Sequence, residues 1–373
     1  ADPDTAGRSA RSLQHLAINL GSLDGQAALE LLRRAYERHP SDYSINHLLS
    51  YYLTRQRHES ERLLDEGIAH SLAALAVRPE SSGARNQLAM TLAQKGDLDG
   101  ALTELREGIR IDPNHSQSHA NLGVVLLRKR DLDGAASAFR EAIRVDPGSI
   151  VAHTKLGGVL TRTGDLDGGI AQFREAVRLG SRDHTTHLRL GHSLLNKRNH
   201  DEAIPILREA IRLAPEYAWS HWVLGQALVS KGDFLGAVEA CRKATALDPG
   251  QPDMERALAD AERKAALHPR LPAVLRGEDR PATAEDWQVL AIICYTLGNH
   301  AAAARLWRQA FETFPELAGD LNGNRYDAAC AAALAGNAEW RGQARVWLRA
   351  ELDLRAEQVN GKPFPGVKSA DQS

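Results

Sequence analysis

Four histidines recur along the chain at a fixed interval of 34 residues, and histidine is a common ligand of zinc. A zinc ion requires each ligating nitrogen at about 2.0–2.1 Å, whereas helices packed side by side lie about 8–10 Å apart. Histidines on successive packed helices therefore cannot easily share one ion. The denser group of His184, His187 and His192 lacks the i, i+4 spacing with which one helix face holds zinc. We predict no metal and no cofactor, and we assign a packing role to the recurring histidines, which are His119, His153, His187 and His221.

The sequence Asp-Leu-Asp-Gly occurs three times at the same interval, beginning at Asp97, Asp131 and Asp165. Closely spaced aspartates before a glycine suggest calcium, but an EF-hand loop needs a third oxygen ligand before the glycine and a glutamate six residues after it. Here the chain instead passes straight into an apolar helical pattern. We therefore predict that these aspartates cap helices, because a carboxylate accepts hydrogen bonds from the free N–H groups of a helix N-terminus.

No arrangement of residues typical of an enzyme is present in the sequence. Ser/His/Asp and Cys/His sets, a phosphate-binding glycine loop and a Gly-x-Ser-x-Gly turn are all missing. The three cysteines, Cys241, Cys294 and Cys330, are too few and too scattered for a disulfide framework or a set of metal ligands, and they suit a reducing compartment. We predict that the chain is not an enzyme, and that Cys241 and Cys294 are inert core residues.

Charge and hydropathy exclude further classes of protein. A net charge of −2 and a pI near 6.8 offer no general attraction for nucleic acid or an anionic membrane surface. No apolar run approaches the roughly 18 residues that span a bilayer, and the first residues do not resemble a signal peptide. We expect a cytoplasmic protein that neither inserts into membranes nor binds nucleic acid.

The elements that must position these residues follow from the 34-residue period itself. Counting from the start of each copy, positions 7 and 11 are large and apolar, positions 8, 20 and 27 are small, and position 24 is larger and mostly apolar. Small residues let two helices approach closely, and the larger ones fill the space between them. The five copies in register are 82–115, 116–149, 150–183, 184–217 and 218–251.

Each copy therefore predicts two helices, over positions 1–14 and about 18–31, joined by a tight turn. Proline at position 32 ends the second helix in four copies, because proline lacks the N–H that would continue it. The third copy has Ser181 at this position, so we expect its second helix to run on or to end less sharply.

This pattern resembles the tetratricopeptide repeat, which implies an all-α, right-handed superhelical solenoid of antiparallel helix pairs. Weaker copies extend the pattern in both directions, and one of them contains about five extra residues near 55–61. We leave the starting Ala1-Asp2-Pro3 out of the fold because it is typical of a cloning scar, in which case the natural protein begins further upstream. The expected division is 9–81 degenerate pairs, 82–251 regular repeats, 252–283 linking helix and linker, 284–317 a further repeat, 322–359 capping helices and 360–373 a disordered tail.

The last third of the chain carries a more particular resemblance. It contains Ala-Glu-Arg at 261–263, Leu-Pro-Ala-Val-Leu-Arg-Gly-Glu at 271–278, Ala303 with Arg-Leu-Trp at 305–307, and Arg-Tyr-Asp-Ala-Ala-Cys-Ala-Ala-Ala-Leu-Ala-Gly at 325–336. These segments resemble the C-terminal repeat region of planctomycete-type bacterial serine/threonine kinases, over about residues 9–357. The resemblance implies an arm that recruits signalling partners. The chain itself has no glycine-rich loop, His-Arg-Asp or Asp-Phe-Gly motif, and so no machinery for phosphoryl transfer.

In this repeat family, positions 2, 5, 6, 9, 12 and 13 of the first helix line an inner groove. None of the 48 acidic residues of the chain falls on these positions in the regular repeats, whereas four basic residues do, and two tryptophans follow them. A cationic groove with an aromatic end suits an extended peptide that is acidic or phosphorylated and has an apolar anchor. The groove residues we predict are Gln87, Asn121, Arg128, Lys155, Arg162, Arg189, His192, Trp219, Trp222 and Gln226.

Several alternatives to this groove stay open, as does the oligomeric state. The first helices could avoid acids for other reasons, and the tryptophans could bury against the following repeat. A clamp for a C-terminal carboxylate fits less well, because positions 5 and 9 lack its lysine and asparagine. The targeting arm of a protein O-glycosyltransferase would have asparagine at every position 6, where this chain has Gln87, Asn121, Lys155, Arg189 and Val223. The third alternative is a structural spacer that binds nothing.

Overall fold

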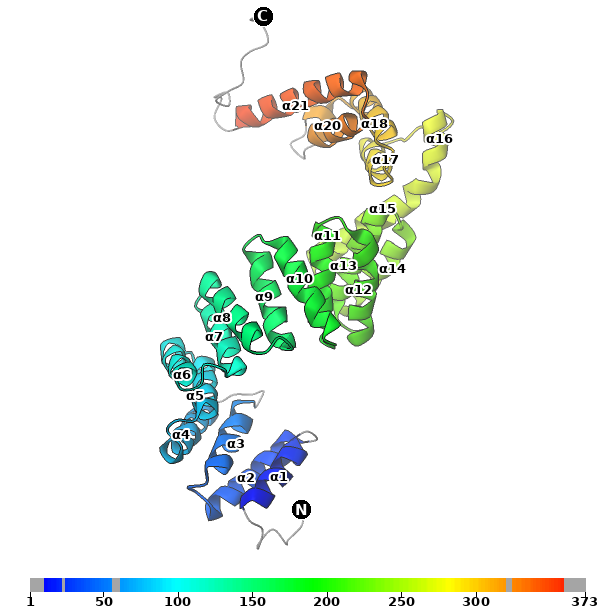
Figure 1. Cartoon of the computed structure of the whole chain (residues 1–373). Helices are drawn as coiled ribbons and strands as arrows, with labels where there is room; N and C mark the ends of the chain where they lie inside the picture. The colour runs from blue at the N-terminus through cyan, green and yellow to red at the C-terminus, as the bar shows by residue number, and fades with distance from the viewer. Residues whose placement is uncertain (1–9, 22–23, 56–60, 320–323, 359–373) are drawn as a thin grey trace, which may run out of the picture. The chain divides into compact units, whose positions relative to one another are not determined.

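The computed structural model describes residues 10–21, 24–55, 61–319 and 324–358, and every regular element in these ranges is a helix (Figure 1). The predicted all-α fold is therefore confirmed. The chain forms two compact units, one up to Arg182 and one from Asp183, and we describe each by itself. The starting tripeptide, the extra residues 56–60 and the tail from residue 360 lie outside the described residues.

The first unit is a row of helix pairs in which each helix packs on the one that follows it. In its regular repeats the first helix of a pair, the A helix, starts at position 1, and the second, the B helix, starts at position 17. The helices are α1 (Ala10–Gly21), α2 (Gly25–Arg38), α3 (Tyr43–Thr54), α4 (Glu61–Val77), α5 (Ser82–Lys95), α6 (Leu98–Ile111), α7 (Ser116–Arg128), α8 (Leu132–Val145), α9 (Ile150–Arg162) and α10 (Leu166–Arg178).

The second unit begins with two regular helix pairs and then departs from the pattern. A single helix, α15, follows the second pair, and a short 3₁₀ turn and α16 lead to the next pair. The helices are α11 (His184–Asn196), α12 (His200–Leu213), α13 (Ala218–Lys231), α14 (Phe234–Leu247), α15 (Pro252–Leu267), η2 (His268–Arg270), α16 (Leu271–Arg276), α17 (Ala284–Thr296), α18 (His300–Thr313), α19 (Glu316–Gly319), α20 (Asn324–Leu334) and α21 (Ala338–Gln358).

Within each unit the A helices form one layer and the B helices another. In the first unit α5 contacts both α3 and α7, and in the second α13 contacts both α11 and α15, while each B helix packs mainly between two A helices. Because the A helices approach one another more closely than the B helices do, each unit curves towards its A layer. We call the side of this layer that points away from the B helices the A-helix face.

Glycine at position 8 explains how the two layers come so close. A Cβ added to Gly123 would lie 2.7 Å from the Phe139 ring, and one added to Gly157 would lie 2.9 Å from Phe173. Both rings are almost fully buried. Position 24 can therefore hold a large side chain only where position 8 leaves room for it.

The aspartates of the Asp-Leu-Asp-Gly sequences cap helices, as predicted. Asp97, Asp131 and Asp165 each accept a hydrogen bond of 2.8 Å from the backbone N–H of the glycine three residues later. The second aspartate of the first sequence, Asp99, forms an ion pair with Lys129 of the following repeat. These carboxylates are thus used within the fold, in capping and in contacts between repeats.

The turn between A and B helices requires a left-handed residue at position 15. Three regular repeats supply glycine there, with φ between 85° and 97°. The other two hold arginine: Arg130 with φ 64° and Arg198 with φ 58°. A left-handed conformation costs a residue with a Cβ about 1–2 kcal/mol, so these two arginines occupy positions that glycine fits better.

The expectation that the helix before Ser181 would run on is wrong. α10 ends at Arg178, one residue earlier in its repeat than α8. Gly180 takes a left-handed conformation with φ 90°, and the N–H of Ser181 donates to the carbonyl of Ala176. Glycine therefore ends this helix where the other repeats use proline.

The histidine ladder has the structural role that we predicted. Nε2 of His119, His153 and His221 donates to the carbonyl of the proline six residues earlier, at 2.8–3.0 Å. Trp287 does the same with its indole N–H, at 3.2 Å from the carbonyl of Pro281. His187, which has Ser181 in place of that proline, instead bonds through Nδ1 to the carbonyl of Asp183 at 3.2 Å. In the repeats that follow a proline, position 4 therefore supplies a donor for the carbonyl left free where the preceding repeat ends.

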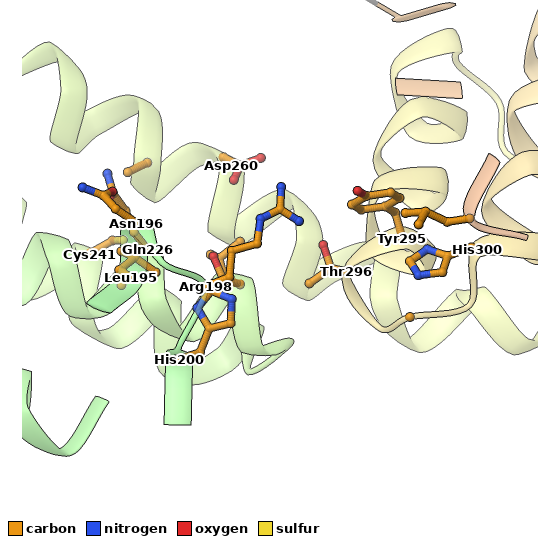
Figure 2. Close-up of a pocket in the computed structure, with 16 residues that line it drawn as sticks. Leu195, Asn196, Arg198, His200, Gln226, Cys241, Asp260, Tyr295, Thr296 and His300 are labelled. Carbon is orange, nitrogen blue, oxygen red and sulfur yellow. The ribbon is translucent and has the colours of Figure 1, made fainter. Parts of the chain in front are cut away.

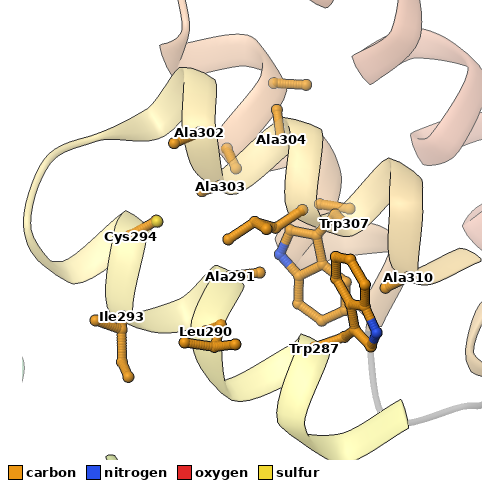
Figure 3. Close-up of a cluster of buried hydrophobic side chains, with 14 of the residues drawn as sticks. Trp287, Leu290, Ala291, Ile293, Cys294, Ala302, Ala303, Ala304, Trp307 and Ala310 are labelled. Atoms are coloured by element: carbon orange, nitrogen blue, oxygen red, sulfur yellow. The ribbon is translucent and has the colours of Figure 1, made fainter. Parts of the chain in front are cut away.

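The segment predicted as a linker is packed. Leu271 and Val274 of α16 are buried in one hydrophobic cluster with Phe234 of α14 and Trp287 of α17. The centre of this cluster is shown in Figure 3, where Trp287 and Trp307 lie among the alanines of α17 and α18. The proline and glycine content of the segment indicated a loop, but its apolar residues at helical spacing fix it to the second unit.

Candidate peptide-binding surface

The boundary between the two units falls inside the predicted groove. Each unit therefore presents its own A-helix face, and we treat the two faces separately. Gln87, Asn121, Arg128, Lys155 and Arg162 belong to the first unit, and Arg189, His192, Trp219, Trp222 and Gln226 belong to the second.

Two cations of the first unit are free. Lys155 and Arg162 are exposed on α9, and neither makes a hydrogen bond or an ion pair with any residue that the structure describes. Arg128 donates to the backbone carbonyl of Ala93, in the last turn of α5, where the helix dipole favours a positive charge. The face of the first unit is thus cationic, with most of its free charge on α9.

Two predicted residues of this face are used inside the protein instead. Gln87 is only 9% exposed, and its amide donates to the Thr54 hydroxyl at 3.1 Å. Asn121 is equally buried and donates to the side-chain oxygen of Asn86 at 2.8 Å. These amides join successive A helices, so they have little left to offer a ligand.

The second unit offers one free cation at the predicted positions. Arg189 on α11 is exposed and has no polar partner within residues 61–319 or the other described ranges. His192 follows it on the same helix, and the atoms packed around its ring lower its pKa below the ordinary value of histidine. His192 is therefore neutral near pH 7 and gains charge only in more acidic solution.

The two tryptophans of α13 differ in exposure. Their rings meet edge to face, with centroids 4.9 Å apart. Trp219 is 42% exposed, whereas Trp222 is partly buried against the cluster that contains Met254 of α15. The alternative that the tryptophans bury against the following element therefore holds for Trp222, and Trp219 is the exposed aromatic residue.

A cavity of about 780 Å³ lies in the second unit, and the sequence did not point to it. It is lined by residues of α11, α12, α13, α14, α15, α17, α18 and α20 and by the turns that contain Arg198 and Gly298. Of the predicted residues only Gln226 lines it. Figure 2 shows the Arg198 side chain extending from its turn towards the side where Asp260 and Thr296 lie. The sequence feature that could have pointed to this cavity is Arg198 at position 15, where three of the regular repeats have glycine. Polar groups on the wall belong to Asn196, Arg198, His200, Gln226, Ser230, Asp260, Tyr295, Thr296 and His300.

Comparison with known families agrees with this architecture. The tetratricopeptide repeat model matches residues 61–116, 88–150, 120–184 and 188–252, which together make up just over half of the chain. The chain is a tetratricopeptide repeat protein. No curated protein matches it significantly.

Solved structures of tetratricopeptide repeat proteins and related helical arrays are similar to this one. A structure reported with the functional characterisation of Pseudomonas aeruginosa pilF is 18% identical, with a TM-score of 0.53, and covers 60% of this chain and 99% of that one. The Cut9–Hcn1 hetero-tetramer of APC/C is 18% identical, with a TM-score of 0.54, and the match covers 70% of this chain and 50% of that one. YrrB, described as a TPR protein with an unusual peptide-binding site, is 21% identical, with a TM-score of 0.46. The match covers 50% of this chain and 96% of that one. At these identities the first two support the fold alone.

Two further observations on this tetratricopeptide repeat protein concern metal ions and membranes. Among the described residues no group of three or more histidine, cysteine, aspartate or glutamate side chains is placed to hold a metal ion. None of the described helices is both long enough and apolar enough to cross a membrane.

The cysteines of the repeat core are expected to be unreactive. Burial raises the pKa of Cys241 and of Cys294 to about 11, so at pH 8 only about one thiol in a thousand is ionised. Cys330 is only partly buried. We expect Ellman's reagent to modify one thiol per folded chain and all three after denaturation in guanidinium. A thiol that reacts quickly in a folded Cys330→Ser variant would contradict this assignment.

Proposed function

We propose that the chain is a scaffold that binds a protein or peptide partner on its A-helix faces. The supporting observation is a difference between the two layers. On the B helices, Arg110, Arg144, Arg178 and Arg212 each pair with a glutamate three residues earlier. On the A helices, Lys155, Arg162 and Arg189 have no such partner among the described residues. The B helices also carry exposed arginines without a described partner, Arg106, Arg140 and Arg208. Each regular B helix holds acidic residues, however, whereas the A helices of the five regular repeats hold none. The A-helix faces therefore present positive charge without a neighbouring carboxylate to compete with a ligand.

The partner we propose is an acidic or phosphorylated segment with an apolar anchor. Free guanidinium and ammonium groups bind carboxylates and phosphates through charge-assisted hydrogen bonds. The exposed Trp219 ring offers a large apolar surface of the kind that dominates many interfaces. Charge and aromatic surface together favour a peptide of this class over a purely apolar one.

We also propose that the chain is the recruiting arm of a bacterial serine/threonine kinase acting in the cytoplasm. This proposal rests on the sequence resemblance of residues 261–336 alone. The reading frame upstream of residue 4 tests it, because a glycine-rich loop and a His-Arg-Asp motif there would support a kinase parent. An upstream frame without them would remove this part of the proposal and leave the scaffold function as it stands.

Capture of partners by the purified chain is expected to weaken as salt increases. Exposed charges are screened over about 8–10 Å at 0.10–0.15 M ionic strength and over about 3 Å at 1 M. Pull-downs from a lysate of the source cells, washed at increasing sodium chloride, measure this effect. The Trp219→Ala variant should lose capture at every salt concentration, since it removes the apolar anchor. Partners held equally at low and high salt would count against the cationic faces.

A further inference from the structure

Arg198 combines an unfavourable backbone with an unused side chain. Its left-handed conformation, φ 58°, is the one for which three of the five regular repeats use glycine. Its guanidinium lines the cavity of the second unit and has no hydrogen bond or ion pair with any described residue. Strained residues of this kind concentrate at functional sites, because packing alone gives no reason to keep them.

Arg198 is the charged side chain of the cavity that is available to bind a ligand, because Asp260 is already paired and His200 is neutral. Asp260 lines the same space, but it is paired with Lys264 at 2.5 Å. His200 is neutral near pH 7, because burial and the positive charges of Lys231 and Arg198 lower its pKa. The cavity therefore offers a ligand the free guanidinium of Arg198, while the one carboxylate that lines it, Asp260, is already paired with Lys264.

We propose that this cavity is an anion subsite in which Arg198 binds an acidic side chain of a bound peptide. The inference rests on the proposed peptide-binding function and adds a specific pocket to it. Gln226 and Thr296 line the pocket beside Arg198, so neutral donors are at hand for the remaining oxygens of the anion. A volume of about 780 Å³ accommodates more than one peptide residue. A glutamate carboxylate and a phosphoserine share the chemistry that this site recognises.

The test compares Arg198→Gly with Arg130→Gly. Both changes place glycine at a left-handed position, so neither should lower the unfolding midpoint, but only Arg198 lines the cavity. The probe is fluorescein-labelled hexaglutamate, followed by anisotropy at low salt, with hexaglutamine as the uncharged control. We expect Arg198→Gly to weaken hexaglutamate binding about tenfold or more, and Arg130→Gly to leave it unchanged. A hexapeptide with alternating phosphoserine tests the second source of the anion. If Arg198→Gly weakens binding of this peptide more than binding of hexaglutamate, the site favours phosphate, and the opposite order favours carboxylate.

A second variant gives an effect of the opposite sign. Asp260→Asn removes the carboxylate that faces the same space, so it should strengthen hexaglutamate binding several-fold. The proposal is overturned if Arg198→Gly binds hexaglutamate as the unmodified chain does, if the unmodified chain does not bind it, or if Asp260→Asn binds it no better. None of these results would decide whether the chain captures native partners, which the salt-dependent pull-down measures separately.

Discussion

Replacing Arg128, Arg162 and Arg189 together with glutamate is expected to abolish capture of native partners without unfolding the protein. Each substitution turns an attraction for an acidic segment into a repulsion. Three such reversals are expected to cost about 3 kcal/mol or more, which is about a hundredfold in affinity. The fold should survive, because all three side chains are exposed and none belongs to a hydrophobic cluster. Quantitative pull-down and a circular-dichroism melt measure the two properties.

The matched control reverses the same number of charges in the same repeats but on the other layer. Arg144, Arg178 and Arg212 lie on the B helices, where each pairs with a nearby glutamate in solvent. Their replacement by glutamate changes the net charge equally and should leave capture close to that of the unmodified chain. Equal losses in both triple variants would show that the partner responds to net charge, and the A-helix faces would have no special role.

The parts of this structure that could be predicted from the sequence are those that depend on near neighbours along the chain. The small residue at position 8 and the large one at position 24 predict the helix pair because both act within one repeat. The capping role of Asp97 follows from the three residues after it, and the bond from His119 to the Pro113 carbonyl spans only six. Because these local patterns recur along the repeats, each of them could be recognised from the sequence alone.

The candidate site depends on contacts between helices that are distant in sequence, and there the prediction was incomplete. Whether Asn121 is free is decided by Asn86 in the preceding repeat, and whether Trp222 is exposed is decided by α15, which lies outside the regular pattern. The cavity brings Arg198 together with Thr296, nearly a hundred residues later. Periodicity places a side chain on a face of its helix but says nothing of what packs against that face.

Shortening Phe139 to alanine is expected to cause the largest loss of stability of any substitution considered. The ring is fully buried and occupies the space that Gly123 leaves between α7 and α8. Removing it opens a cavity that the neighbouring glycine cannot fill, and such substitutions cost about 3–5 kcal/mol. Urea unfolding followed by circular dichroism should show an earlier transition for the part of the array around this repeat, because repeat proteins are stabilised mainly by contacts between neighbours.

Phe139→Leu is the control that the chain itself provides. Leu207 occupies the same position two repeats later, is fully buried, and packs against Gly191 as Phe139 packs against Gly123. Leucine is therefore compatible with glycine at position 8, and the change should cost only about 1 kcal/mol. If alanine and leucine at position 139 shifted the urea midpoint equally, the size of the side chain at position 24 would not be what holds the two layers together. A large difference between them would show that the repeat 116–149 is stabilised chiefly by one bulky side chain set against one glycine.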